Sequence, residues 1–182
     1  FVEDVAASGG YWLACAADEI FASKASIIGS IGVVSSGFGF DKAIKKIGVD
    51  RRLYTSGENK AILDPFLPEN KDDIKRLKDI QKELHNQFIS FVKSRRGSKI
   101  TNKNKDLFTG AFWSGEKSLE LGLIDDYGEM KSVLKQRFGE NVKIKEFAPK
   151  KKLFGLSNLF SGALDIFINK IEERISFKKF GL

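Results

Sequence analysis

Cysteine, histidine and methionine are nearly absent from this chain of 182 residues, which contains one of each and only 3 prolines. Because a single Cys cannot form an internal disulfide, the small secreted domains that disulfides stabilise are excluded. No uninterrupted apolar run reaches the roughly 18–20 residues that a membrane-spanning helix requires. One His restricts every His-based catalytic or metal site to a single side chain. The only methionine is Met130 and the first residue is Phe1, so we expect a fragment or a processed product.

The charged residues are unevenly distributed along the chain. The 31 Lys and Arg residues outnumber the 24 Asp and Glu residues, which gives a net charge of +7. Residues 1–64 hold 7 basic and 8 acidic side chains, whereas residues 129–182 hold 12 basic and 6 acidic ones. Nucleic-acid-binding proteins gather basic residues on the working face, so nucleic acid is not an expected partner. The basic C-terminal part fits either a solubilising surface or attraction to an anionic membrane.

Short apolar segments alternate with amphipathic ones, which is typical of a layered α/β fold. Strands or extended segments are predicted at 1–5, 20–22, 27–34, 51–55, 108–113 and 142–147. Helices are predicted at 11–17, 41–47, 69–94, 114–121 and 131–138. We expect residues 6–10 to form a turn of small residues, Asp41 and Ser114 to cap their helices, and Gly97 to end the longest helix.

The helix predicted at 69–94 has one apolar stripe, because its apolar residues recur every three or four positions. The stripe consists of Ile74, Leu77, Ile80, Leu84, Phe88, Phe91 and Val92. After Pro149 the composition changes, and residues 150–182 are predicted to form a basic amphipathic helical extension. We expect this extension to pack on the parent domain or on a neighbouring subunit, in preference to a membrane interface. The chain therefore divides into 1–149 and 150–182.

Ser8 lies between a predicted strand and a predicted helix, where amides at the start of the helix can stabilise a developing oxyanion. The simpler interpretation is that Ser8 caps the helix. A nucleophilic serine needs a base, and with one His the obvious alternative is a lysine kept neutral by burial. Lys60 precedes an apolar stretch that can bury its amine, although such lysines commonly reach solvent. We interpret His85 as a partly exposed helix residue and Cys15 as a small core residue.

A series of short sequence blocks extends over residues 1–130. The blocks are Asp4–Trp12 (DVAASGGYW), Ala16–Asp18, Gly29–Val33 (GSIGV), Phe40–Lys42, Ser56–Lys60 (SGENK), Phe108–Gly110 and Leu121–Asp125 (LGLID). In this order they resemble the signal peptide peptidase A family of serine peptidases (SppA/SohB-like). The resemblance implies an α/β fold with crotonase/ClpP-like layers, incomplete here at its N-terminal side.

The resemblance also implies roles for residues of this chain. Ser8 matches the nucleophile, Lys60 matches the general base, and Ser30 matches a serine that orients the lysine amine. The Gly9 amide is the expected oxyanion donor, while the second donor belongs to a Gly-rich segment that we expect upstream of Phe1. The expected substrate-binding residues are Gly29, Ile31, Gly32 and Val33. No cofactor and no metal are expected.

The resemblance implies a Ser/Lys endopeptidase that hydrolyses signal-peptide remnants or membrane-associated polypeptides, as a homo-oligomer at the bacterial inner membrane. An N-terminal membrane anchor is expected outside this sequence, and the basic extension is a second candidate membrane contact. Two alternatives of other classes stay open: a non-hydrolytic crotonase-fold enzyme acting on acyl-CoA, and a catalytically silent membrane-associated scaffold. Because half of the oxyanion hole is expected upstream, we expect little activity from these residues alone.

Overall fold

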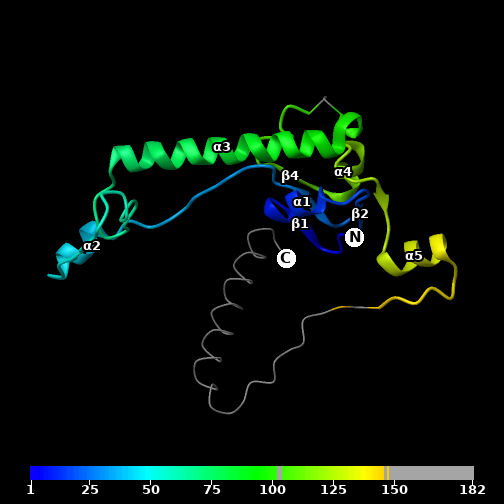
Figure 1. The fold of residues 1–182 in the computed structure, drawn as a ribbon, viewed down its shortest axis with the longest axis horizontal. Helices are drawn as coiled ribbons and strands as arrows, with labels where there is room; N and C mark the ends of the chain where they lie inside the picture. Colours follow the sequence, from blue (N-terminus) through cyan, green and yellow to red (C-terminus); the bar gives the residue numbers. More distant parts are fainter. Residues whose placement is uncertain (102–103, 146, 148–182) are drawn as a thin grey trace, which may run out of the picture. The chain divides into compact units, whose positions relative to one another are not determined.

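The computed structural model describes residues 1–101, 104–145 and 147 and is of mixed α/β type (Figure 1). Phe1–Val142 forms one compact unit. Its strands are β1 (Val5–Ala7), β2 (Phe21–Ala22), β3 (Ile27–Gly29), β4 (Phe112–Ser114) and β5 (Asp126–Tyr127). Its helices are α1 (Gly9–Ala14), α2 (Asp41–Lys46), α3 (Lys71–Arg96), α4 (Gly115–Glu120) and α5 (Met130–Phe138), with a 3-10 turn at Gly97–Lys99. The extension predicted at 150–182 lies outside the described residues.

The strands form two small sheets. In the first sheet, β3 pairs in parallel with β1 and antiparallel with β4, so the strand order is β1-β3-β4. The register places Gly29 opposite Ala7 on one side and opposite Phe112 on the other. In the second sheet, β2 pairs in parallel with β5. β1 and β3 run in the same direction, so their C-terminal ends lie at the same edge of the sheet. Ser8 and Ser30 directly follow these strand ends.

The hydrophobic core combines residues of the sheets, of α1 and of the C-terminal half of α3. The Trp12 ring of α1 stacks on Phe88 of α3 with centroids 4.5 Å apart. The Tyr11 hydroxyl donates a hydrogen bond to the Leu123 carbonyl at 2.8 Å. The buried side chains include Tyr11, Cys15, Ile28, Ile31, Phe88, Val92, Leu107, Leu123 and Ile124. These contacts fix α1 directly after Ser8, and the burial of Cys15 confirms its prediction as a core residue.

Helix α3 confirms the longest predicted helix, with both ends two residues later than predicted. It begins where the Asn70 side chain accepts a hydrogen bond from the Asp72 amide at 2.8 Å, which satisfies one of the free amides of the first turn. It ends at Gly97, as predicted, where φ is 47° and glycine is the residue that adopts this conformation most easily.

The apolar stripe of α3 is buried along only part of its length. Phe88, near the C-terminal end, is 1% exposed, whereas Ile80 and Leu84 are 48% and 41% exposed. The C-terminal half of α3 therefore packs on the core, and the N-terminal half carries apolar side chains that stay partly or largely exposed.

One turn prediction and three strand predictions differ from the structure. Ala6 and Ala7 belong to β1 rather than to a turn, because they pair with Ile28 and Gly29 of β3. Residues 30–34 and 51–55 are not strands, since no neighbouring strand in the described part of the chain pairs with them. Residues 142–145 form no strand either, and the remainder of that predicted segment is only partly described. The three segments predicted as strands lack a partner strand in the described part of the chain, and a strand requires one.

The helix predictions are closer to the structure. Ser114 caps α4 as predicted, because its Oγ accepts a hydrogen bond from the Lys117 amide at 3.2 Å. Helix α5 occupies the segment predicted at 131–138 with one extra residue. The prediction that Asp41 caps α2 is wrong: Phe40 holds the cap position, and Asp41 is the first helical residue, where its charge favours the helix N-terminus.

Candidate active site

Ser8 joins β1 to α1 in a strained backbone conformation. Its φ of 53° and ψ of −123° are unusual for a residue other than glycine. The conformation is held from both sides, because the Ser8 amide donates to the Gly29 carbonyl at 2.8 Å and the Ser8 carbonyl accepts from the Tyr11 and Trp12 amides at 3.0 Å. Ser8 is exposed and occupies the cap position of α1, but its hydroxyl makes no capping hydrogen bond. The hydroxyl is therefore available for chemistry.

The backbone next to Ser8 is open on its outer side. Gly9 begins α1, and no atom lies within 4 Å of the position that a Cβ on Gly9 or Gly10 would take. Within the described part of the chain, the Gly9 amide has no hydrogen-bond partner. An amide at this position can donate to an anionic oxygen that is bound next to Ser8.

The segment that follows β3 lies beside Ser8 and has an irregular backbone. Gly29 has φ 105° and Ser30 has φ 52°. The Ser30 amide donates to the Ala111 carbonyl at 2.8 Å, and the Gly32 amide donates to the Ser30 carbonyl at 2.9 Å. The Gly29 carbonyl bonds to the Ser8 amide, so the structure brings Ser8, Gly29 and Ser30 to one edge of the sheet.

Two glycines of this segment are required by close packing. A Cβ on Gly32 would lie 2.9 Å from the Cα of Gly110, and one on Gly29 would lie 2.9 Å from the Trp113 ring. Neither distance is compatible with a larger residue unless the neighbour moves. Ile31, between them, is fully buried, and Val33 is exposed. The expected substrate-binding residues thus form one turn packed tightly on residues 109–113.

Lys60 is not brought to Ser8 in this structure. It is an exposed residue of a turn, in which its amide donates to the Gly57 carbonyl at 3.2 Å. The apolar residues expected to bury it, among them Ile62 and Leu63, are exposed themselves. All hydrogen bonds that residues 33–67 make with described residues stay inside that segment. No hydrogen bond in the described part of the chain joins Lys60 to Ser8 or Ser30.

Two surface hollows lie along the N-terminal half of α3. One has a volume of about 520 Å³ and is lined by polar residues, including Glu58, Asp73 and Arg76. The other, of about 1110 Å³, has apolar residues of the segment 33–67 in its wall, including Phe38 and Leu63. Neither of these two hollows is lined by Ser8, Ser30 or Lys60.

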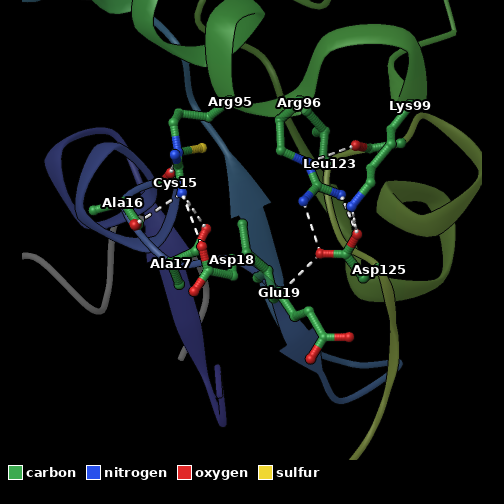
Figure 2. A network of polar contacts seen from close by, with 12 residues as sticks. Cys15, Ala16, Ala17, Asp18, Glu19, Arg95, Arg96, Lys99, Leu123 and Asp125 are labelled. Carbon is green, nitrogen blue, oxygen red and sulfur yellow. Dashed lines mark hydrogen bonds and ion pairs between the residues drawn. The ribbon is translucent and has the colours of Figure 1, made fainter.

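An arginine at the end of α3 fixes the far end of α1 (Figure 2). Arg95 donates hydrogen bonds to the carbonyls of Cys15, Ala16 and Ala17 at 2.9, 3.1 and 3.0 Å. These carbonyls follow the last residues of α1 and have no partners within the helix. Sequence reasoning used Arg95 only as part of the end of a helix, and no local pattern indicates that its side chain reaches α1.

The neighbouring Arg96 lies in a buried ion-pair cluster with Asp125 (Figure 2). Arg96 also donates to the Gly122 carbonyl at 2.9 Å, and Asp125 accepts from the Ile20 amide at 2.8 Å and from Lys99 at 2.5 Å. Burial by itself raises the pKa of Asp125, but the hydrogen bonds from Arg96 and Lys99 outweigh it and lower that pKa to about 2. The cluster joins α3, the segment before β2 and the segment before β5.

Within the described ranges, no group of three or more His, Cys, Asp or Glu side chains is placed to hold a metal ion. Over those residues, too, no helix is both long enough and apolar enough to span a membrane.

Comparison with known proteins gives the family. The family model described as "Peptidase family S49" matches residues 1–145. "Probable protease SohB" of Buchnera aphidicola subsp. Acyrthosiphon pisum is 37% identical over 139 residues, which cover 76% of this chain and 40% of that protein. "Putative signal peptide peptidase SppA" of Enterococcus faecium is 31% identical over 132 residues, which cover 72% of this chain and 38% of that protein. The chain belongs to peptidase family S49, which confirms the resemblance inferred from the sequence blocks.

A relative with a different name matches over a small part of its length. "Na(+)/H(+) antiporter NhaA" of Brucella abortus is 56% identical over 155 residues, which cover 85% of this chain and 21% of that protein. This chain matches only about a fifth of that protein. The name of that protein therefore assigns no transport activity to this chain. The chain spans about 40% of the SohB and SppA relatives.

Proposed function

We propose that this protein is a serine endopeptidase in which Ser8 is the nucleophile and Lys60 the general base. The observation that carries the proposal is the backbone of Ser8. In a chain of a peptidase family, an exposed serine is held at φ 53° between a strand and a helix, and its hydroxyl is not used for capping. Strained backbone conformations are kept where the surrounding structure enforces them, and they cluster at active sites.

The proposed reaction passes through an acyl-enzyme. Neutral Lys60 accepts the proton of Ser8 as Oγ attacks the peptide carbonyl carbon, and the Gly9 amide donates to the resulting oxyanion. The C–N bond breaks when the Lys60 ammonium returns that proton to the leaving amine. Water then attacks the ester and passes a proton to Lys60, and Ser8 regains its proton as the ester bond breaks. Ser30 is proposed to orient the lysine amine.

This mechanism requires the segment 33–67 to bring Lys60 against Ser8. Two features of the segment support this proposal. Its hydrogen bonds with described residues are all internal, so no such bond holds the segment away from Ser8. The segment is also rich in exposed apolar side chains. These side chains are Val33, Val34, Phe38, Phe40, Ile47, Val49, Leu53, Tyr54, Ile62, Leu63, Phe66 and Leu67. Exposed apolar side chains in this number favour docking, and we propose a homo-oligomer in which the segment is covered.

The proposed substrates are polypeptides, chiefly remnants of signal peptides and other membrane-associated chains. We propose that Gly29, Ile31, Gly32 and Val33 form the substrate-binding turn. The amide of the exposed residue Val33 has no hydrogen-bond partner in the described part of the chain, so an extended peptide can pair with it there. We further propose a fold with crotonase/ClpP-like layers, in which residues 1–149 form the peptidase domain and residues 150–182 form a basic extension. We also propose that the protein associates with the bacterial inner membrane. The mechanism uses no cofactor.

The test uses the full-length protein and a quenched fluorescent peptide with an apolar cleavage site. Ser8→Ala and Lys60→Ala should each lower turnover by at least 1000-fold, a scale typical of removing a nucleophile or its base, with the fold unchanged by circular dichroism. Ser56→Ala and Lys46→Ala, two exposed positions in the same chain, are the matched controls. Turnover that persists in Lys60→Ala would show that another group is the base.

Labelling separates the proposal from the other classes. A serine-directed phosphonylating probe should modify Ser8 in the parent protein and leave Ser8→Ala unmodified, whereas an acyl-CoA enzyme or a silent scaffold should not react.

A further inference from the structure

The only histidine of the chain contacts the segment that carries Ser30. His85 is a half-buried residue of α3, and its Nε2 lies 3.1 Å from the carbonyl oxygen of Ile31. A carbonyl oxygen only accepts hydrogen bonds, so Nε2 carries the proton and donates it. The prediction of a partly exposed helix residue is confirmed, but the side chain also makes a contact across 54 residues of sequence.

The Ile31 carbonyl lies in the turn that follows β3, outside the strands of the sheet. The bond from the Gly32 amide to the Ser30 carbonyl turns the chain around Ile31, whose side chain is fully buried. The Ser30 amide is held on the other side by the Ala111 carbonyl at 2.8 Å. Two residues outside the turn therefore hold it. His85 contacts the Ile31 carbonyl, and the Ala111 carbonyl accepts from the Ser30 amide.

We propose that His85 is a positioning residue, which fixes the turn at residues 30–32 and thereby the backbone of Ser30 that carries the proposed orienting hydroxyl. The inference rests on the proposed function, because Ser30 is there assigned to orient the Lys60 amine. Ser30 has φ 52°, a conformation that must be enforced by its surroundings. Without the bond from His85, the Ile31 carbonyl turns toward water and the turn relaxes. Displacements of about 1 Å at such positions cost roughly 100-fold in rate.

The variants separate this bond from the bulk of the imidazole ring. In the full-length protein, His85→Leu keeps a side chain of similar size without a donor, and His85→Gln keeps an N–H at a similar reach. Asn86→Leu, at an exposed position of the same helix, is the matched control. We expect kcat to fall between tenfold and 100-fold in His85→Leu with KM within twofold, and to stay within threefold of the parent in His85→Gln and Asn86→Leu. Equal kcat in all three variants would overturn the proposal.

A double-mutant cycle tests whether His85 acts through Ser30. If it does, His85→Leu in a Ser30→Ala background should lower kcat by less than twofold, because the hydroxyl to be positioned is already gone. An additive loss in the double variant would overturn the proposal. A failure of the proposed function would give a different result. The Ser8→Ala variant would then retain peptidase turnover, both with His85 and with Leu at position 85.

A measurement without substrate tests the geometry directly. The amides of Ser30 and Gly32 both donate within this turn, so their hydrogen exchange reports whether it is held. We expect exchange at least tenfold faster in His85→Leu, and unchanged in His85→Gln and Asn86→Leu. Unchanged exchange in His85→Leu would overturn the proposal, even where kcat falls.

Discussion

Arg96 and Asp125 form a bidentate ion pair that joins the last turn of α3 to the segment before β5. The Nη1–Oδ2 distance is 2.7 Å and the Nη2–Oδ1 distance is 3.2 Å. The side chains are only 3% and 14% exposed. Because the Asp125 carboxylate also accepts from the Ile20 amide and from Lys99, each of its oxygens has two donors.

This pair predicts a specific dependence of stability on acid. The pKa of Asp125 is about 2 in the folded protein, below its ordinary value of 3.8, so its stabilisation is complete above about pH 4 and is lost as the pH falls through 2. The parent protein should lose about 2 kcal/mol of unfolding free energy over this range from this group. Asp125→Asn should lose about 3 kcal/mol at pH 7, because Arg96 keeps an uncompensated buried charge. Urea denaturation at pH 7 and at pH 3, where about half of this acid-dependent loss has occurred, measures both effects. Equal acid sensitivity in the two proteins would contradict the assignment.

Arg95 should stabilise α1 through its three hydrogen bonds to carbonyls. Arg95→Ala is expected to lower the free energy of unfolding by about 1–2 kcal/mol. Arg95→Lys should restore less than half of the loss, because an ammonium group cannot match the planar fork of a guanidinium. Thermal unfolding provides the measurement. Arg76→Ala, on the exposed half of the same helix, should change stability by less than about 0.5 kcal/mol, and a similar loss there would argue against a specific role of Arg95.

Gly32 should tolerate no side chain. In Gly32→Ala the new Cβ meets the Cα of Gly110 at 2.9 Å, which is backbone and cannot rotate away. We expect a loss of about 1–3 kcal/mol in unfolding free energy and, because Ser30 is displaced with it, a fall in peptidase activity. Gly37→Ala is the control, since no atom lies within 4 Å of its Cβ position. If urea denaturation finds the two variants equally stable, the close approach of residues 32 and 110 is not maintained in solution.

The two halves of α3 should differ in their sensitivity to truncation. Phe88→Ala should cost about 3–5 kcal/mol, because the ring is buried and stacked on Trp12. Ile80→Ala, about two turns earlier and 48% exposed, should cost less than about 1 kcal/mol in the isolated subunit. Denaturation curves of both variants at low and high protein concentration provide the comparison. A large loss for Ile80→Ala that appears only at high concentration would locate a subunit contact on the N-terminal half of the helix.

Local signals in the sequence were sufficient for much of the helical structure. Gly97 ends α3 because a left-handed conformation is needed there, and Ser114 caps α4 because its hydroxyl reaches the amide three residues later. Ser8 lies between a strand and a helix, as predicted. Each of these features is decided within a few residues of sequence or by one strand pairing.

The remaining features depend on contacts that sequence reasoning could not place. The hydrogen bond from His85 to Ile31 and those from Arg95 to the end of α1 join residues far apart in the chain, and neither has a local pattern. The exposed position of Lys60 has the same origin. The apolar residues around it predict burial, but burial requires a surface to pack against, and no described residue supplies it.

The order of strands in the first sheet has a consequence for how the protein folds during synthesis. β1 and β3 are close in sequence and pair early, whereas β3 meets β4 only after α2 and all of α3 have been made. Closing so long a loop costs chain entropy and slows folding. Ser30 and Gly32 depend on residues 110 and 111 for their final positions. During synthesis the turn beside Ser8 therefore lacks its contacts until residues 110–114 have emerged from the ribosome.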